Sequence, residues 1–327
     1  MSETRPQEGG RRAVHLPPRI DTLMGHAFSR MKRRSTSLET PVPLPWDGVS
    51  RALGGGMWPG LYVVVGNTGS GKTQFTLGAA IHAAQQGIPV LYIALEGSGF
   101  DLVARTAGLL LEGQWSDLWL GRASVERIEE AERLCRQKLS DCPLYVEVGS
   151  PYGWHYKTLK TRAEAILAAH KRTLRNEEGL AVKPMLVVLD YLQLVGGEGD
   201  LRNRVGKAAY TAYEVAKSLN AVVMVVSSTA REHYKILSGA RQTSAGKQPE
   251  LGDGDPARLI GLGKESGEIE YGADGVLVLC QDKEKTVTQN WLAIAKRRAG
   301  KVKWIPMLFD GGQYRERSTR DDDDVVF

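Results

Sequence analysis

Residues 66–73 read GNTGSGKT and match the pattern G-x-x-x-x-G-K-[ST], in which x is any residue. An apolar run at 61–65, typical of a strand, precedes this segment, and a run typical of a helix follows it at 74–81. In a strand, glycine-rich loop and helix of this kind, backbone N–H groups and the positive end of the helix converge on the phosphates of a nucleotide. The sequence therefore predicts a phosphate-binding loop, or P-loop, at residues 66–73.

Two side chains of the P-loop have specific roles in such sites, and ATP with Mg²⁺ is the expected pair of cofactors. Lys72 would reach the β- and γ-phosphates, and the hydroxyl of Thr73 would hold Mg²⁺. A chance match is the alternative in a chain with 37 glycines, but the flanking strand and helix argue against it. The residues expected to bind the nucleotide are Gly66, Asn67, Thr68, Gly69, Ser70, Gly71, Lys72, Thr73 and Gln74.

The composition is that of a globular protein. Of the 327 residues, 42% are hydrophobic and 25% are charged, which is enough apolar material for a sizeable core. No apolar run approaches the ~20 residues of a membrane span, and residues 1–12 lack the apolar centre of a signal peptide. The three cysteines show no metal-binding spacing and no even disulfide framework, which fits a reducing compartment. A cytoplasmic protein is therefore expected, and its net charge of +5 permits an anionic partner without requiring one.

Alternating strand and helix patterns predict an α/β fold with a doubly wound, mostly parallel sheet and flanking helices. The run at 185–189 is apolar without alternation, as in a parallel strand buried on both faces. Strands are expected at 61–65, 89–95, 143–148, 184–190, 221–227, 275–280, 290–296 and 302–309. Helices are expected at 72–86, 100–111, 124–139, 157–173 and 206–219.

Four segments are expected along the chain. Residues 1–18 are polar and predicted to be disordered. Residues 19–45 hold an amphipathic helix at 20–34 and a proline-rich connection, residues 46–315 form the α/β domain, and residues 316–327 form an acidic tail. The helix can pack on its own domain or dock on a neighbouring subunit. Residues 234–258, rich in Gly, Ser, Pro and charge, are predicted to form a long mobile loop.

Two carboxylates follow buried strands and are candidates for the chemistry. Asp190 stands at the carboxyl end of the run 185–189, where an acidic residue beside a P-loop can hold the Mg²⁺ shell. Glu96 ends the next strand after the P-loop helix, where a carboxylate can orient and deprotonate an attacking water. The alternatives are a turn-capping carboxylate for Asp190 and a surface glutamate for Glu96.

Cations gather in three further places. Lys296, Arg297 and Arg298 follow a strand and form either a solvated turn or a group that neutralises a transferring phosphoryl group. Arg231 and Lys264 lie in loops after strands and could bind backbone phosphates of a nucleic acid or remain solvated. Aromatic residues make up 7% of the chain and do not alternate with basic ones, so a base-stacking platform is not expected.

Three further strings resemble motifs of the DnaB-type replicative helicases. LDYLQL at 189–194 resembles the D-Y-L-Q-L segment of that family, and GKESGEIEYGAD at 263–274 resembles its L-R-E-S-G-x-I-E-x-x-A-D. AKRRAG at 295–300 resembles its A-K-x-R-x-G. The order and approximate spacing also agree, so residues 20–310 resemble the C-terminal ATPase domain of the family without its N-terminal collar domain.

The resemblance implies a RecA-like ATPase that assembles as a ring, usually of six subunits, with ATP bound between neighbours. It implies that Lys72 and Thr73 are the P-loop residues, Glu96 the catalytic carboxylate and Asp190 the Mg²⁺-linked aspartate. Lys296 and Arg298 match the basic pair that reaches the next subunit's γ-phosphate. Lys264, Glu265 and Gly267 match the loop that follows single-stranded DNA. The helix at 20–34 matches the linker helix that packs on the adjacent subunit.

Some positions depart from the family pattern. The family string S-Q-L-x-R becomes Ser227-Ser228-Thr229-Ala230-Arg231, so the glutamine that senses the γ-phosphate is replaced, with Ser228 or Thr229 as substitutes. Lys264 replaces an arginine and loses its bidentate geometry. These changes leave ATP binding intact and weaken the expectation of processive unwinding.

The leading hypothesis is a ring-forming, DNA-dependent ATPase that moves on single-stranded DNA and unwinds duplexes. Its expected partners are single-stranded DNA, further copies of itself and a loader or replication protein, with no membrane. The first alternative is a RecA/KaiC-like switch that assembles on DNA or protein and hydrolyses ATP without unwinding. The second is a monomeric P-loop kinase, against which the segment 296–298 and the helix at 20–34 argue.

Overall fold

The computed structural model describes residues 17–149, 154–230, 233–238, 242–243, 246–247, 252, 254–264, 267–282, 289–310 and 312–317. Internal contacts divide the chain into two units, Met1–Glu39 and Thr40–Phe327. Most of the expected disordered N-terminus and most of the expected acidic tail lie outside the described residues.

The described residues of the first unit contain one helix, α1 (Ile20–Ser35), as the sequence predicts. Its apolar side chains are all exposed, and they are Ile20, Leu23, Met24, Phe28 and Met31. After the helix, Glu39 is only 2% exposed. Its carboxylate accepts hydrogen bonds from Arg30 and Arg34 and forms an ion pair with Arg33. This cluster folds the chain back onto the carboxyl end of α1.

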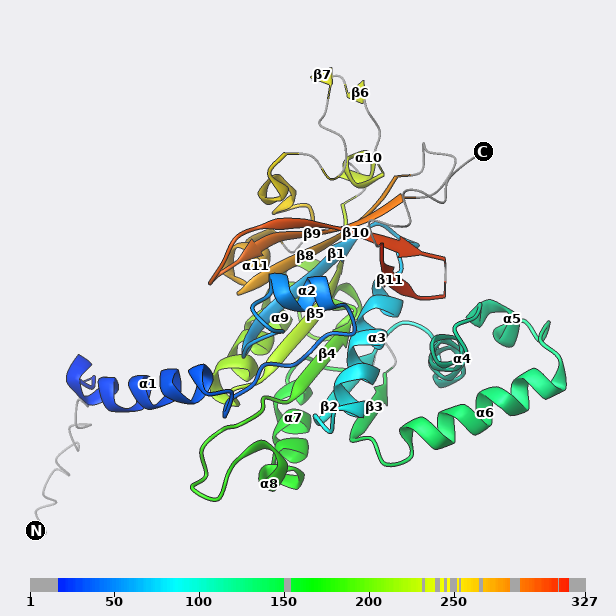
Figure 1. Ribbon diagram of the computed structural model, residues 1–327. Coiled ribbons are helices and arrows are strands. Elements are labelled where there is room, and N and C mark those ends of the chain that lie inside the picture. The colour runs from blue at the N-terminus through cyan, green and yellow to red at the C-terminus, as the bar shows by residue number, and fades with distance from the viewer. Residues whose placement is uncertain are drawn as a thin grey trace, which may run out of the picture. The chain divides into compact units, whose positions relative to one another are not determined.

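The second unit is built on a sheet that has nine strands among the described residues, in the order β11-β10-β9-β8-β1-β5-β4-β2-β3. The strands are β1 (Gly60–Gly66), β2 (Val90–Ala94), β3 (Leu144–Val148), β4 (Leu186–Asp190), β5 (Val222–Ser228), β8 (Gly275–Asp282), β9 (Gln289–Arg297), β10 (Lys303–Phe309) and β11 (Tyr314–Glu316). The six strands from β8 to β3 run parallel, and β9, β10 and β11 continue the sheet antiparallel (Figure 1). The prediction of a mostly parallel α/β sheet is confirmed.

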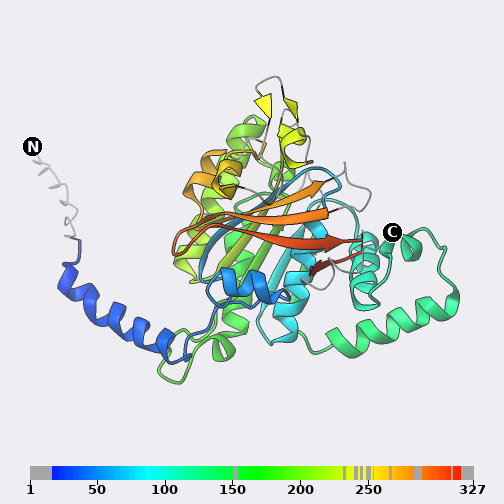
Figure 2. The same cartoon turned by 45° about the horizontal axis from the view of Figure 1, so that its top comes forward.

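Helices cover both faces of this sheet, as the two views in Figures 1 and 2 show. They are α2 (Asp47–Ala52), α3 (Lys72–Gln85), α4 (Gly99–Leu110), α5 (Trp115–Trp119), α6 (Val125–Leu139), α7 (Thr158–Ala169), α8 (Lys171–Leu174), α9 (Leu201–Ser218), α10 (Tyr234–Leu237) and α11 (Gly267–Gly272). Short 3-10 turns lie at Leu192–Leu194 and Pro256–Leu259. Side chains of α7 and α9 contribute to the core on one face, and side chains of α2, α3 and α4 contribute to the core on the other.

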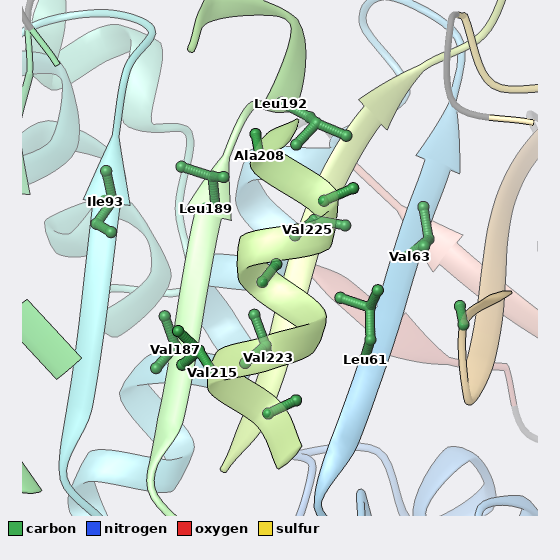
Figure 3. Packing of buried hydrophobic residues seen from close by; sticks show 14 of the residues in the cluster. Leu61, Val63, Ile93, Val187, Leu189, Leu192, Ala208, Val215, Val223 and Val225 are labelled. Atoms are coloured by element: carbon green, nitrogen blue, oxygen red, sulfur yellow. The ribbon is translucent and has the colours of Figure 1, made fainter. Parts of the chain in front are cut away.

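The central strands are buried on both faces because they are apolar throughout. Every residue of β1, β2 and β4 is buried. Figure 3 shows α9 lying across the sheet, with Val215 beside Val187 and Ala208 near Leu189 and Leu192. Burial of this apolar surface is the main force that fixes strand order and therefore fixes which loops meet at each end of the sheet.

Three local predictions differ from the structure. The helix expected at 157–173 is divided at His170, whose φ of −110° and ψ of 20° separate α7 from α8. The loop at 234–258 is not irregular throughout, since it contains α10, the paired strands β6 (Gln242–Thr243) and β7 (Gly246–Lys247), and the turn at Pro256–Leu259. The short helices α2, α5 and α11 were not expected. In the described part of the chain, no helix combines the length and apolarity needed to cross a bilayer.

Candidate nucleotide site

The P-loop leaves the carboxyl end of β1 and turns into α3. Gly71 precedes the helix with a φ of +77°, a conformation that glycine adopts without strain. A Cβ atom at Gly71 would lie 2.5 Å from Cζ of Phe309, and one at Gly66 would lie 2.5 Å from Oγ of Ser70. At Gly71 the positive φ and the Phe309 ring both favour glycine, whereas a Cβ at Gly66 would require Ser70 to shift.

Lys72 spans the P-loop from inside. Its Nζ donates to the carbonyl oxygens of Gly66 and Asn67, each at 2.9 Å. Burial lowers the pKa of Lys72 from 10.5 to about 8, and the nearby carboxylates of Asp190 and Glu96 only partly oppose this effect. An anionic group in the loop would favour the charged form of Lys72 and would compete with the two carbonyls for its protons.

Asp190 ends β4 beside the P-loop helix and is 3% exposed. Its Oδ2 accepts a hydrogen bond of 3.0 Å from the hydroxyl of Tyr92, which also contacts Oγ1 of Thr76 at 3.1 Å. Burial raises the pKa of Asp190, while hydrogen bonds from Thr73 and Tyr92 and the charge of Lys72 work in the other direction. The carboxylate thus touches the P-loop hydroxyl with which it was predicted to hold a metal ion.

Glu96 follows β2, the neighbour of β4 in the sheet, and is exposed to solvent. Partial desolvation and repulsion by Asp190 raise the pKa of its carboxyl group, against the attraction of Lys72 and Arg105. A raised pKa brings a carboxylate closer to the range in which it can accept a proton from water near neutral pH. The charges of Glu96, Asp190 and Lys72 therefore lie close enough to shift one another's pKa.

Arg105 on α4 is a cation of this group that sequence reasoning missed. Burial lowers the pKa of its guanidinium group, and the charges of Asp190, Tyr92, Asp101 and Glu96 oppose that effect. Its Cζ lies 3.9 Å from the centre of the Trp115 ring, a cation–π contact. The signal in the sequence was helical spacing, because α4 begins just after Glu96 and carries Arg105 two turns along.

Aromatic residues support the P-loop from the side of the antiparallel strands. Phe309 stacks on Tyr314 with ring centres 4.5 Å apart, and the Tyr314 hydroxyl donates to the carbonyl of Ser70. The side chain of Gln74 is buried and donates to the carbonyl of Gly312. The predicted nucleotide contact of Gln74 would therefore involve its backbone, because its amide group faces the chain before β11.

The surroundings of the P-loop fit a nucleotide with Mg²⁺. Three polar side-chain atoms at the P-loop and at the tip of β5 are buried without a hydrogen-bond partner: Asn67 Oδ1, Ser70 Oγ and Thr229 Oγ1. Over the ranges described, no group of three or more His, Cys, Asp or Glu could hold a metal ion. Mg²⁺ is typically bound through one or two side chains together with substrate phosphates and water, and Thr73 and Asp190 are the residues that would hold it.

Lys296 and Arg298 lie at the other end of the sheet. In the pairing of β8 with β9, Arg297 stands opposite Gly275, which in turn pairs with Tyr62 near the start of β1. The P-loop follows the last residue of β1. The two predicted cations and the P-loop of one chain therefore lie toward opposite ends of neighbouring strands, and α11 lies beside β8 in Figure 1.

Strand alternation separates the three cations. Lys296 Nζ donates to the carbonyls of Glu270 and Tyr271, and Arg298 pairs with Asp274 at 2.9 Å. Arg297 points to the opposite face, where it donates to the carbonyl of Ala52 at 2.6 Å. Of these three cations, Lys296 and Arg298 share a face.

The predicted nucleic-acid residues are described only in part. Lys264 is exposed, its N–H donates to the carbonyl of Ser228 at 2.6 Å, and its carbonyl accepts 2.7 Å from Nε2 of Gln193. Gly267 begins α11. Arg231 and Glu265 lie outside the described residues. Gln193 was not singled out from the sequence, yet it joins the tip of β4 to Ser227 and to Lys264.

Comparison with known proteins identifies related sequences and structures. The family model for the DnaB-like helicase C terminal domain matches residues 48–316. A curated relative, the replicative DNA helicase DnaB of Nostoc sp., is 28% identical over 234 residues, which cover 71% of this chain and 24% of that protein. The chain thus spans about a quarter of the length of that relative.

Three solved structures share the fold. A structure that consists of an ATPase domain matches with a TM-score of 0.71 and 18% identity, covering 92% of this chain and all of that one (100%). The structure of a DnaB-like replicative helicase, described together with its interactions with primase, matches with a TM-score of 0.69 and 17% identity and covers 92% of this chain and 68% of that one. A KaiC-like protein of Pyrococcus horikoshii matches with a TM-score of 0.52 and 14% identity and covers 86% of this chain and 99% of that one. At these identities, the likeness shows a shared RecA-like fold.

Proposed function

Because this chain belongs to the family of DnaB-like helicase C terminal domains, we propose that it forms a ring, hydrolyses ATP in response to DNA, moves along single-stranded DNA and unwinds duplexes. Membership of the family makes the chain a DnaB-like ATPase of the RecA-like class. The ring, the movement and the unwinding are inferred from the arrangement of its own residues.

The observation that supports the ring most strongly is the distance between the two halves of the site. Arg297, which stands between the two cations, is level with Tyr62, four residues before Gly66, so the strands separate this position from the P-loop by about 13 Å. The carbonyls of Glu270 and Tyr271 hold Lys296, and Asp274 holds Arg298, at that end of the strands and away from the phosphates of their own P-loop. They can act on a transferring phosphoryl group only if they face the P-loop of a second copy.

Each residue of the proposed site has a chemical task. Lys72 and the loop amides bind the phosphate chain, and Thr73 and Asp190 are the residues that would hold Mg²⁺, which neutralises phosphate charge. Glu96 accepts the proton of the attacking water. Lys296 and Arg298 of the adjacent copy stabilise the negative charge that develops on the γ-phosphate oxygens.

Single-stranded DNA is the proposed polymer partner. Lys264 is exposed on the loop that precedes α11, and Arg231 and Glu265 complete the predicted contact segment. A lysine contacts backbone phosphates as a point charge, so binding should depend more on salt than on base sequence. The exposed apolar side of α1 is proposed to pack on a neighbouring copy, and a loader or replication protein is a further proposed partner. We place this activity in the cytoplasm.

A mixing experiment tests the shared site. Lys72→Ala removes the phosphate-binding cation, and the double variant Lys296→Ala/Arg298→Ala removes the cations lent to a neighbour. Each protein alone should be inactive, whereas a co-assembled mixture should recover ATP turnover at interfaces that combine an intact P-loop with intact cations. Co-assembly is verified by particle size with a non-hydrolysable nucleotide. Co-assembled mixtures without any recovered turnover would refute the shared site.

An ATP-driven switch without unwinding is the second candidate. The KaiC-like neighbour with its TM-score of 0.52 supports a RecA-like core of that broader kind, and Ser228 stands where the DnaB pattern has glutamine. A strand-displacement assay separates the candidates. DNA-stimulated ATPase activity without displacement of a labelled strand would favour the switch.

A further inference from the structure

One short segment connects the proposed DNA loop to the proposed trans-acting cations. Residues 261–264 lie at the P-loop edge of the sheet, where Thr229 forms a bridge with Gly263 and donates its own N–H to the carbonyl of Gly66. The chain then forms α11 and reaches Asp274 immediately before β8, at the opposite edge. α11 is therefore the covalent path between the two edges.

Glu270 ties this helix to the DNA loop. It is completely buried, with 0% exposure, although it carries a carboxylate. Its Oε2 accepts a hydrogen bond of 2.6 Å from the N–H of Gly261, and its Oε1 accepts one of 2.9 Å from the N–H of Gly263. The backbone of Lys264, the next residue, is bonded in turn to Ser228. Both carboxylate oxygens thus hold the main chain that presents Lys264.

The other end of α11 holds the cations. The backbone carbonyls of Glu270 and Tyr271 accept hydrogen bonds from Nζ of Lys296. Asp274, which follows the helix, pairs with Arg298 through its side chain and accepts the Arg298 N–H at its carbonyl at 2.8 Å. Because these carbonyls belong to the end of a helix, the positions of the cations depend on the position of α11.

We propose that Glu270 is a positioning residue that couples DNA contact at Lys264 to the placement of Lys296 and Arg298. A shift of the 261–264 loop moves the carboxylate with it, because separating a buried carboxylate from two N–H donors is more costly than displacing one short helix. The backbone carbonyl of Glu270 then moves as well, and Lys296, which is bonded to it, moves toward or away from the adjacent copy. This inference rests on the proposed function.

Glu270→Gln tests the coupling with little change of shape. The amide replaces one acceptor oxygen by an NH₂ donor, so one of the two loop N–H groups faces another donor. At saturating single-stranded DNA, where weaker DNA binding has no effect, the ratio of DNA-stimulated to DNA-free turnover should fall about fivefold or more. Glu129→Gln, on the exposed side of α6, makes the same chemical change and should leave the ratio unchanged. An unchanged ratio in Glu270→Gln would overturn the inference.

Mixed assemblies distinguish coupling from simple loss of packing. Wild-type protein is mixed with Lys72→Ala or with Lys72→Ala/Glu270→Gln, so that the added copies turn over no ATP and contribute only their DNA loops and cations. The second mixture should show weaker DNA stimulation of the wild-type sites, and equal rates would overturn the inference. If the amide variant fails to assemble, Glu270→Asp, which keeps the charge but is too short to reach both N–H groups, replaces it with the same expected results. A wild-type protein that assembles but shows no DNA stimulation would instead refute the proposed function itself, and the inference with it.

Discussion

The protonation of Lys72 should control nucleotide affinity in an accessible pH range. Burial lowers its pKa to about 8 in the nucleotide-free chain, and phosphates that replace the two carbonyl acceptors restore the charged form. Binding above pH 8 must therefore take up a proton. With a pKa of about 8, about three quarters of the molecules carry the charge at pH 7.5 and about one tenth carry it at pH 9.

The expected result is a dissociation constant that increases about eightfold between pH 7.5 and pH 9, because only the charged lysine binds the phosphates with full strength. The sign follows from the lowered pKa, since the charged form is present below about pH 8 and is lost as pH rises through that value. The assay is titration of a fluorescent, non-hydrolysable ATP analogue with excess Mg²⁺. Phosphate ionisation does not confuse the result, because the second phosphate pKa of about 6 lies below this range.

Lys72→Arg is the matched control. An arginine stays charged at every pH of the titration, so the variant can bind more weakly overall but its affinity should not change between pH 7.5 and pH 9. A wild-type dissociation constant that is constant over the same range would refute the reasoning. It would mean that the two carbonyls and two carboxylates keep Lys72 fully charged despite its burial.

Three further substitutions have effects that follow directly from the contacts. Tyr92→Phe removes a hydrogen bond that lowers the pKa of Asp190. The Mg²⁺ concentration needed for half-maximal turnover should therefore increase, and it should increase more at pH 6 than at pH 8. The free energy of unfolding should fall by about 1–2 kcal/mol. Gly71→Ala places a Cβ against Phe309 and should lower the unfolding free energy by about 2 kcal/mol or more, measured in urea. Gly69→Ala shares the positive φ but meets open space, so it should cost only about 1–2 kcal/mol, and equal losses would contradict the role of Phe309.

Much of the sheet could be predicted because its central strands are apolar without interruption. β1, β2 and β4 are buried at every position, and runs of this kind have few alternatives to a parallel, doubly covered strand. The alternation of these strands with helices then indicates a doubly wound sheet, whereas the order of the strands was not predicted. The same logic placed Asp190 and Glu96 at one edge, since parallel strands end together.

Other features depend on contacts that periodicity does not encode. Nothing in the segment 157–173 is a glycine or proline, so no residue signalled the break at His170. The hydroxyl of Tyr92 and the carboxylate of Glu270 are buried in places that only the folded chain defines. The position of Tyr92 inside an apolar strand could have indicated a buried hydroxyl. Glu270, in contrast, was identified only as one position of the motif at 263–274.

The placement of Lys296 and Arg298 has a consequence for how such a protein is controlled. If Lys296 and Arg298 complete the reaction at the P-loop of a neighbour, as proposed, substrate alone does not switch on an isolated molecule. Under the shared-site proposal, output per molecule rises with protein concentration, and dilution acts as an inhibitor. A cell could then regulate the enzyme simply by where, and how densely, its copies are gathered.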